Sequence, residues 1–126
     1  MNTIYYLIHS KSFGDTLAAT PTLRYLSQSH SQKINVITHK KHIFKNNQYV
    51  NDCLSFDEFN DVDISNIIKY ESFTYAGRQD NNGIEKKFSH IDTRQLHSMD
   101  LGFQLMPHQM DYDYNPDHVE LSYDLP

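Results

Sequence analysis

An apolar run over residues 4–8 is followed by a short polar loop, a glycine and then a helical pattern. A short continuous apolar run that ends in small polar residues is typical of a buried strand, so we expect a strand over residues 3–10. When such a strand breaks at a glycine and the chain re-enters as a helix, the carboxyl end of the strand is where α/β proteins bind ligands. The loop over residues 11–14 is therefore the first candidate for a functional site.

The helical pattern after this loop has an apolar face built on leucines. A proline cannot sit freely inside a helix, and Pro21 interrupts the pattern. We therefore expect a first turn over residues 15–19 and then a main helix with Thr20 as its N-cap and Pro21 at its first position. Residues 27–32 are polar and are expected to form a loop.

The following segments continue an alternation of strands and helices. Residues 33–38 are apolar and β-branched, which predicts a second strand. A short polar helix or turn is expected over residues 39–47, and a third strand is best placed at residues 52–56. Strands that alternate with helices imply a parallel sheet with right-handed crossovers. The sequence therefore predicts an α/β fold: a Rossmann-like parallel sheet flanked by helices.

The second half of the sequence has a weaker pattern. Residues 61–70 carry apolar side chains at mixed spacing, so we expect a short helix or turn there and a strand near residues 72–75. Residues 77–87 are polar and contain glycines, which predicts a loop. A helix is expected over residues 90–105, and a last short strand over residues 119–121.

Composition limits the classes of function. A chain of 126 residues is expected to form a single domain with a substantial core. Its 11 basic and 16 acidic residues give a net charge of −5, which argues against binding to nucleic acid. No apolar stretch approaches the roughly 20 residues that span a bilayer, and the N-terminus does not resemble a signal peptide. We therefore expect a soluble, cytoplasmic protein, whose Cys53 is a buried and inert thiol.

Three motifs make the first 56 residues similar to a known family. They are GDTLxxTPxLxxL at residues 14–26, IxVxT at residues 34–38 and FxxNxxVxD at residues 44–52. Together they resemble the N-terminal half of family 9 glycosyltransferases, which are the lipopolysaccharide heptosyltransferases and their relatives. The expected helix end at Gly102 also resembles a helix end of that family.

This resemblance implies one half of a GT-B architecture, in which two Rossmann-like halves face a cleft. The N-terminal half binds a saccharide or lipid-linked acceptor, and the C-terminal half holds the nucleotide-sugar donor. The chain would then be a single acceptor-side domain over residues 1–126, with residues 108–126 as the connector to an absent donor-binding half. It would be inactive alone and would hold no cofactor. Its exposed cleft face would meet a C-terminal half or a second copy, with at most peripheral membrane contact.

The resemblance places Asp15 at the position of the family's catalytic base. In an inverting transfer the acceptor hydroxyl loses a proton as it attacks, so a carboxylate must reach it. A helix N-terminus favours the ionised form that a base needs. The residues alone leave an alternative open, in which Asp15 only caps the first helical turn.

The other candidates surround the same loop. Gly14 is expected to permit a close backbone approach or a positive φ, with an ordinary tight turn as the alternative. Lys11 would orient an anionic acceptor as a point charge, or is simply solvated. Phe13 would form a wall of the pocket or pack on the sheet. The residues expected to bind the acceptor are His9, Ser10, Lys11, Ser12, Phe13, Gly14, Thr16 and Thr20.

Eight histidines raise the question of a metal site. His39 and His42 have a spacing that could chelate a metal, but no third ligand lies nearby, so we expect surface histidines and no metal. A stand-alone, non-catalytic Rossmann-like domain that binds a ligand or a partner is the main alternative function. A flavodoxin-like nucleotide binder ranks last, because the sequence lacks both a GxGxxG motif and a P-loop.

Overall fold

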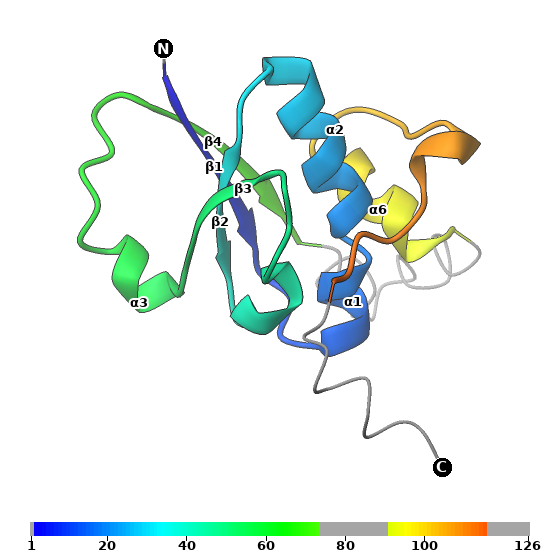
Figure 1. Ribbon diagram of the computed structural model, residues 1–126, viewed down its shortest axis with the longest axis horizontal. Coiled ribbons are helices and arrows are strands. Elements are labelled where there is room, and N and C mark those ends of the chain that lie inside the picture. The colour runs from blue at the N-terminus through cyan, green and yellow to red at the C-terminus, as the bar shows by residue number, and fades with distance from the viewer. Residues whose placement is uncertain (1, 74–90, 116–126) are drawn as a thin grey trace, which may run out of the picture.

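The computed structural model describes residues 2–73 and 91–115 (Figure 1). Within these residues the strands form one sheet in which each neighbouring pair is parallel. The expected α/β, Rossmann-like sheet flanked by helices is confirmed. The strands are β1 (Thr3–Ile8), β2 (Ile34–Thr38), β3 (Val50–Leu54) and β4 (Ile67–Ser72), in the order β3-β2-β1-β4.

The strand order reverses at β1. After β1 the chain builds β2 and then β3 on one side, and it returns to the other side of β1 as β4. In an open α/β sheet such a reversal leaves a crevice beyond the carboxyl ends of the two strands where the order changes. The ends of β1 and β4 therefore define the topological switch point, where a ligand is expected.

Helices pack on both faces of the sheet. Side chains of β1 alternate between the faces, as the pleat of a strand requires. Tyr6 and Ile8 lie in the larger core with Leu23, whereas Tyr5 and Leu7 belong to a smaller cluster on the opposite face. In Figure 1, α2 and α6 lie on one side of the sheet and α3 on the other. The α-helices are α1 (Phe13–Leu17), α2 (Thr20–His30), α3 (Phe56–Phe59) and α6 (Thr93–Asp100).

The main helix, α2, extends further at its C-terminal end than expected and has a different N-cap. Ala19 occupies the cap position and Thr20 is the first helical residue, so the predicted Thr20 cap is wrong. The predicted loop over residues 27–32 is also wrong, because the helix continues to His30. It ends at Ser31, whose φ of 54° is left-handed. Polar residues on the solvent side of a helix cost little, so polarity alone did not mark its end.

Two strands differ from their expected positions. β3 begins and ends two residues earlier than the predicted segment of residues 52–56. β4 occupies residues for which a helix or turn was expected, and the predicted strand at 72–75 shares only Ser72 with it. Parallel pairing explains β4, because all of its residues pair with β1, from Thr3 opposite Ile67 to Ile8 opposite Ser72. The spacing of apolar residues within β4 does not indicate that this segment pairs with β1.

Shorter elements complete the described part of the chain. The 3₁₀ helix η1 (Lys41–Phe44) confirms the expected short helix or turn. The predicted helix over residues 90–105 is present as the shorter α6, and Gly102, with a φ of 94°, confirms the expected helix end. A second 3₁₀ helix, η2 (Pro107–Gln109), follows. The loop expected at 77–87 and the strand expected at 119–121 lie outside the described residues.

The segment after α6 packs back onto the domain. The Arg24 guanidinium donates to the carbonyl oxygens of Gln109 at 3.1 Å and Asp111 at 2.8 Å. The Asp113 N–H donates to the Thr20 hydroxyl at 2.9 Å. Residues 108–115 therefore contact α2 (Figure 1), and residues 116–126 lie outside the described part, so their role as a connector stays a prediction. Among the described helices, none combines the length and hydrophobicity needed to cross a bilayer.

Candidate functional site

The candidate site begins where β1 gives way to α1. Ser12 has an extended backbone, and its hydroxyl accepts a hydrogen bond from the Asp15 N–H at 3.2 Å. Ser12 is therefore the N-cap of α1, and Asp15 is the third residue of the helix. The alternative in which Asp15 serves as the cap of this turn is wrong.

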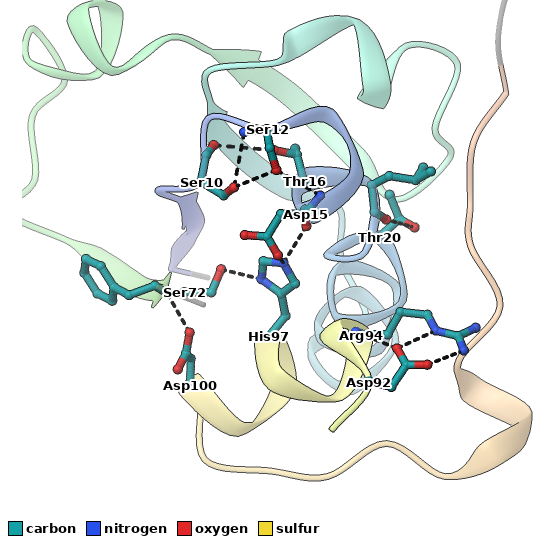
Figure 2. Close-up of polar contacts among 12 residues, drawn as sticks. Ser10, Ser12, Asp15, Thr16, Thr20, Ser72, Asp92, Arg94, His97 and Asp100 are labelled. Carbon is teal, nitrogen blue, oxygen red and sulfur yellow. Dashed lines mark hydrogen bonds and ion pairs between the residues drawn. The ribbon is translucent and has the colours of Figure 1, made fainter. Parts of the chain in front are cut away.

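The Asp15 side chain is directed at a histidine from α6. Its carboxylate is 13% exposed, and its Oδ1 lies 3.4 Å from Nε2 of His97. The same Nε2 lies 2.6 Å from the main-chain oxygen of Asp15. This contact joins residues 82 positions apart in the sequence and ties α6 to the loop after β1. Figure 2 shows the imidazole between Asp15 on one side and Ser72 on the other.

The other side of His97 meets the end of β4. Its Nδ1 lies 2.8 Å from the hydroxyl oxygen of Ser72, which also accepts a hydrogen bond from Tyr6 at 3.1 Å. Tyr6, Ser72 and His97 have no exposed surface. Burial raises the pKa of the Tyr6 phenol far above its usual value, so Tyr6 remains a hydrogen-bond donor. A buried polar chain therefore runs from β1 through β4 and α6 to Asp15.

A second carboxylate lies near this chain. Asp100 follows His97 by one turn of α6, and its Oδ2 accepts a hydrogen bond from the Phe73 N–H at 2.6 Å. Partial burial raises the pKa of Asp100, and the nearby Asp15 carboxylate adds to the rise, while the bond from Phe73 and the proximity of His97 oppose it. Asp15 and Asp100 thus influence each other electrostatically beside the switch point.

Ser72, His97 and Asp15 have the composition of a hydrolase triad. In such a triad the serine must be exposed to attack a substrate, and the histidine must accept its proton. Ser72 has no exposed surface, and its oxygen already accepts the hydroxyl of Tyr6. These contacts make Ser72 and His97 a support for Asp15 and argue against nucleophilic catalysis by Ser72.

Some of the predicted acceptor-binding residues hold the loop together. Ser10 and Thr16 are buried. The Ser10 hydroxyl accepts the Ser12 N–H at 3.3 Å, and the Thr16 hydroxyl donates to the main-chain oxygen of Ser10 at 3.4 Å. Thr20 is also buried, and its hydroxyl donates to the Leu17 oxygen at 2.9 Å. Their hydroxyls thus stabilise the loop, and their contact with an acceptor stays a prediction.

The remaining residues of the loop face solvent. Lys11, Ser12, Phe13 and Gly14 are exposed. The ring of Phe13 is 41% exposed and stacks against His42, with centroids 5.7 Å apart. A ligand could reach these four predicted acceptor contacts without displacing the fold, and it could also reach His9, whose side chain is 30% exposed.

Gly14 lies inside α1, where its φ is not positive. A Cβ built at this position would meet no atom within 4 Å. The expectation of a positive φ at Gly14 is therefore wrong, because the loop closes through the Ser12 cap rather than through a left-handed residue. A close approach of a ligand to its backbone stays a prediction.

Aromatic and imidazole rings line the neighbouring edge of the sheet. His9 stacks on Phe73 at 4.2 Å and contacts Phe56 at 5.0 Å, and His39 stacks on Phe56 at 4.5 Å. His9 also binds Glu71, with Nε2 3.0 Å from Oε1. Partial burial, and then the nearby cations led by Lys11, lower the pKa of His39.

A hollow of about 380 Å³ adjoins this row, between the ends of β2 and β3. Thr38, His42 and Phe56 are among the residues that line it. Flat rings with a few polar groups are the usual lining of a small-molecule site. The stacking of Phe13 on His42 connects this hollow to the loop after β1.

Sequence reasoning missed the central histidine. His97 was expected at the surface with the other histidines, and this is wrong, because His97 has no exposed surface. Leu96, His97 and Ser98 are buried, whereas Met99 is 41% exposed. In a helix of eight residues the apolar side chains are too few to fix which face is buried, so no local signal identified His97.

The described residues contain no group of three or more histidine, cysteine, aspartate or glutamate side chains that could hold a metal. Cys53 is only half-buried, and burial raises the pKa of its thiol to about 11, which is the behaviour of an unreactive cysteine.

Comparisons with known proteins return no match: no family model, no curated protein and no solved structure is similar enough to be counted.

Proposed function

We propose that this chain is the acceptor-binding domain of an inverting glycosyltransferase that resembles the family 9 enzymes. It would act in the cytoplasm on a saccharide or lipid-linked acceptor, and Asp15 would be its catalytic base. One observation carries the proposal: the Asp15 carboxylate lies at the switch point of a parallel sheet, 13% exposed and directed at His97 instead of capping its helix.

In the proposed reaction the acceptor hydroxyl oxygen attacks the anomeric carbon of the donor sugar. A new carbon–oxygen bond forms as the bond from that carbon to the nucleotide diphosphate breaks, and the hydroxyl proton passes to the Asp15 carboxylate. The departing diphosphate would be held by a donor-binding half outside this chain. The domain would therefore position the acceptor and remove its proton, but would not transfer sugar alone.

The shape of the edge supports a saccharide as the ligand. Sugar rings have flat apolar faces and hydroxyl rims, and sites for such molecules combine rings with a few polar groups. The row of His9, Phe56 and His39 supplies the rings. The exposed loop residues Lys11 and Ser12 supply polar groups on the side of Asp15.

The proposal is tested by titrating the isotope-labelled chain with a panel of mono- and oligosaccharides, with and without phosphate groups, and following the amide resonances by NMR. We expect at least one saccharide to shift resonances of residues 9–16 together with His39 and Phe56. The variant Asp15→Asn should keep the fold and bind with an altered affinity. Asp61→Asn, an exposed carboxylate elsewhere in the chain, serves as the matched control and should leave binding unchanged.

Two results would overturn the proposal. One is saccharide binding confined to residues away from β1 and α1. The other is a complete lack of saccharide binding together with binding of a free nucleotide or a protein.

A stand-alone, non-catalytic binding domain is the second candidate function. The hydroxyls of Ser10, Thr16 and Thr20 support it, because their internal hydrogen bonds leave the loop with fewer polar contacts for a reacting substrate. Saccharide binding that is identical in the wild type and Asp15→Asn would favour this candidate, since a base must contact the hydroxyl that it deprotonates.

A further inference from the structure

We infer that His97 is a positioning residue, which fixes the Asp15 carboxylate by donating its Nε2 proton to that residue. The catalytic meaning of the inference rests on the proposed function of Asp15. The arrangement of protons itself follows from the hydrogen-bond partners of His97 and can be measured independently of any reaction.

The partners of the imidazole determine its tautomer. Nε2 faces the main-chain oxygen of Asp15 at 2.6 Å and its Oδ1 at 3.4 Å. Both are acceptors, so a lone pair at Nε2 would be repelled and the proton must be there. The shorter contact is a hydrogen bond that holds the main chain of Asp15, and the longer one brings the same N–H close to the carboxylate, so a single donor faces both groups of Asp15.

The opposite nitrogen is held by a donor. Tyr6 donates to the Ser72 oxygen at 3.1 Å, which leaves the Ser72 proton free to point to Nδ1 of His97 at 2.8 Å. The hydrogen bonds then run in one direction, from Tyr6 to Ser72 to His97 to Asp15. All donors in this buried chain are used, as the cost of an unsatisfied buried polar group requires.

Within residues 2–73 and 91–115, the ionisable groups around His97 are Tyr6 on β1, Asp15 on α1 and Asp100 on α6 itself. Asp100 bonds to the Phe73 N–H, so the Asp15 carboxylate is the acidic side chain paired with Nε2. A donor at this position favours the ionised form of the carboxylate, which is the form that a base must have.

The test uses NMR of the whole chain with labelled histidine and aspartate side chains. In the wild type, the His97 nitrogen shifts should show a protonated Nε2 and an unprotonated Nδ1. In His97→Phe, the titration midpoint of the Asp15 carboxyl should rise, because the N–H that lies 3.4 Å from its Oδ1 is lost and no longer favours the ionised form. His97→Gln, whose amide can donate to the same acceptors, should restore most of this change.

His30→Gln is the matched control, since His30 bonds the hydroxyl of Tyr70 at 2.8 Å, as His97 bonds the hydroxyl of Ser72, but lies on α2. It should leave the Asp15 midpoint unchanged. A proton on Nδ1 with a bare Nε2 in the wild type would overturn the inference. So would an unchanged Asp15 midpoint in His97→Phe or, if that variant does not fold, an Asp15 midpoint in His97→Gln that lies well above that of the wild type.

These outcomes separate the inference from the proposed function. Saccharide binding with an unmoved Asp15 midpoint removes the positioning role and leaves the proposed function standing. A moved midpoint without any saccharide binding removes the proposed function and leaves His97 as the residue that fixes Asp15.

Discussion

Alanine substitution at two glycines should change stability in opposite directions. Gly102→Ala is expected to lower the free energy of unfolding, whereas Gly14→Ala is expected to raise it. The two sites are matched in one respect, because a Cβ at either position would meet no atom within 4 Å. Any difference between the variants therefore reports backbone conformation and not steric clash.

The magnitudes follow from the backbone angles. Gly102 ends α6 with a φ of 94°, a region that costs an L-residue about 1 to 2 kcal/mol. Gly14 lies inside α1, where alanine is favoured over glycine by about 0.5 to 1 kcal/mol. The free energies of unfolding of the two variants should therefore differ by about 2 kcal/mol. For a domain of this size, that difference separates their melting temperatures by roughly 6 to 10 °C.

Urea unfolding of the wild type and both variants, followed by circular dichroism, measures these free energies. A loss of stability in Gly14→Ala with an unchanged denaturant slope would refute the reasoning, because it would mean that Gly14 is not helical in solution. Saccharide titration of Gly14→Ala adds a functional readout. Weaker binding by a more stable protein would support a close approach of the ligand to this backbone, and unchanged binding would exclude it.

Three further predictions concern single side chains. Hydrogen bonds from Ser55 and Lys41 lower the pKa of Glu58 to about 2, so its stabilising effect is complete above its usual pKa of 4.5 and is lost as the pH falls toward 2. The stability difference between the wild type and Glu58→Gln should accordingly be present at pH 7 and nearly absent at pH 2 in urea unfolding. Asp92→Ala removes the N-cap of α6 and should lower the free energy of unfolding by about 1 kcal/mol, measured in the same way. Burial raises the pKa of the Cys53 thiol to about 11, so its reaction with a thiol reagent at pH 7 should be much slower in folded protein than in urea.

The parts of the fold that could be predicted from the sequence depend on local signals. The apolar run of β1 needs both faces buried, and the proline at position 21 and the glycine at position 102 restrict where helices begin and end. Each of these signals comes from a few neighbouring residues, so it can be interpreted without knowing which segment packs against them. The sheet class followed from the alternation of such segments.

The parts that could not be predicted depend on partners far along the chain. β4 has mixed spacing and forms a strand because β1 offers it a parallel edge along its whole length. His97 is buried because α6 packs against β4 and α2, where Ser72 and Asp15 supply its hydrogen bonds. The sequence contains these residues but not their proximity, which is why Asp15 was found as a candidate and its neighbours were not.

The different behaviour of two similar motifs explains why the Asp15 carboxylate lies beside His97 and not at its helix end. In the capping box of α3, the Ser55 N–H donates to the Glu58 carboxylate at 2.8 Å, so this carboxylate is hydrogen-bonded to the N-cap residue of its own helix. Ser12 and Asp15 have the same spacing, but the Ser12 N–H donates to the Ser10 hydroxyl at 3.3 Å. A serine two residues before the cap thus takes the place of the acid.

The consequence is specific to the loop after β1. Because Ser10 bonds the N–H of the cap residue, the helix end does not need the Asp15 carboxylate, which lies instead beside His97 at the switch point. Replacing Ser10 with alanine would leave that N–H without its partner and favour rotation of the carboxylate back to the helix end. The spacing of a serine and an acid alone therefore predicts a capping box, and the residue two positions before the serine decides whether the acid bonds to the N–H of the cap residue.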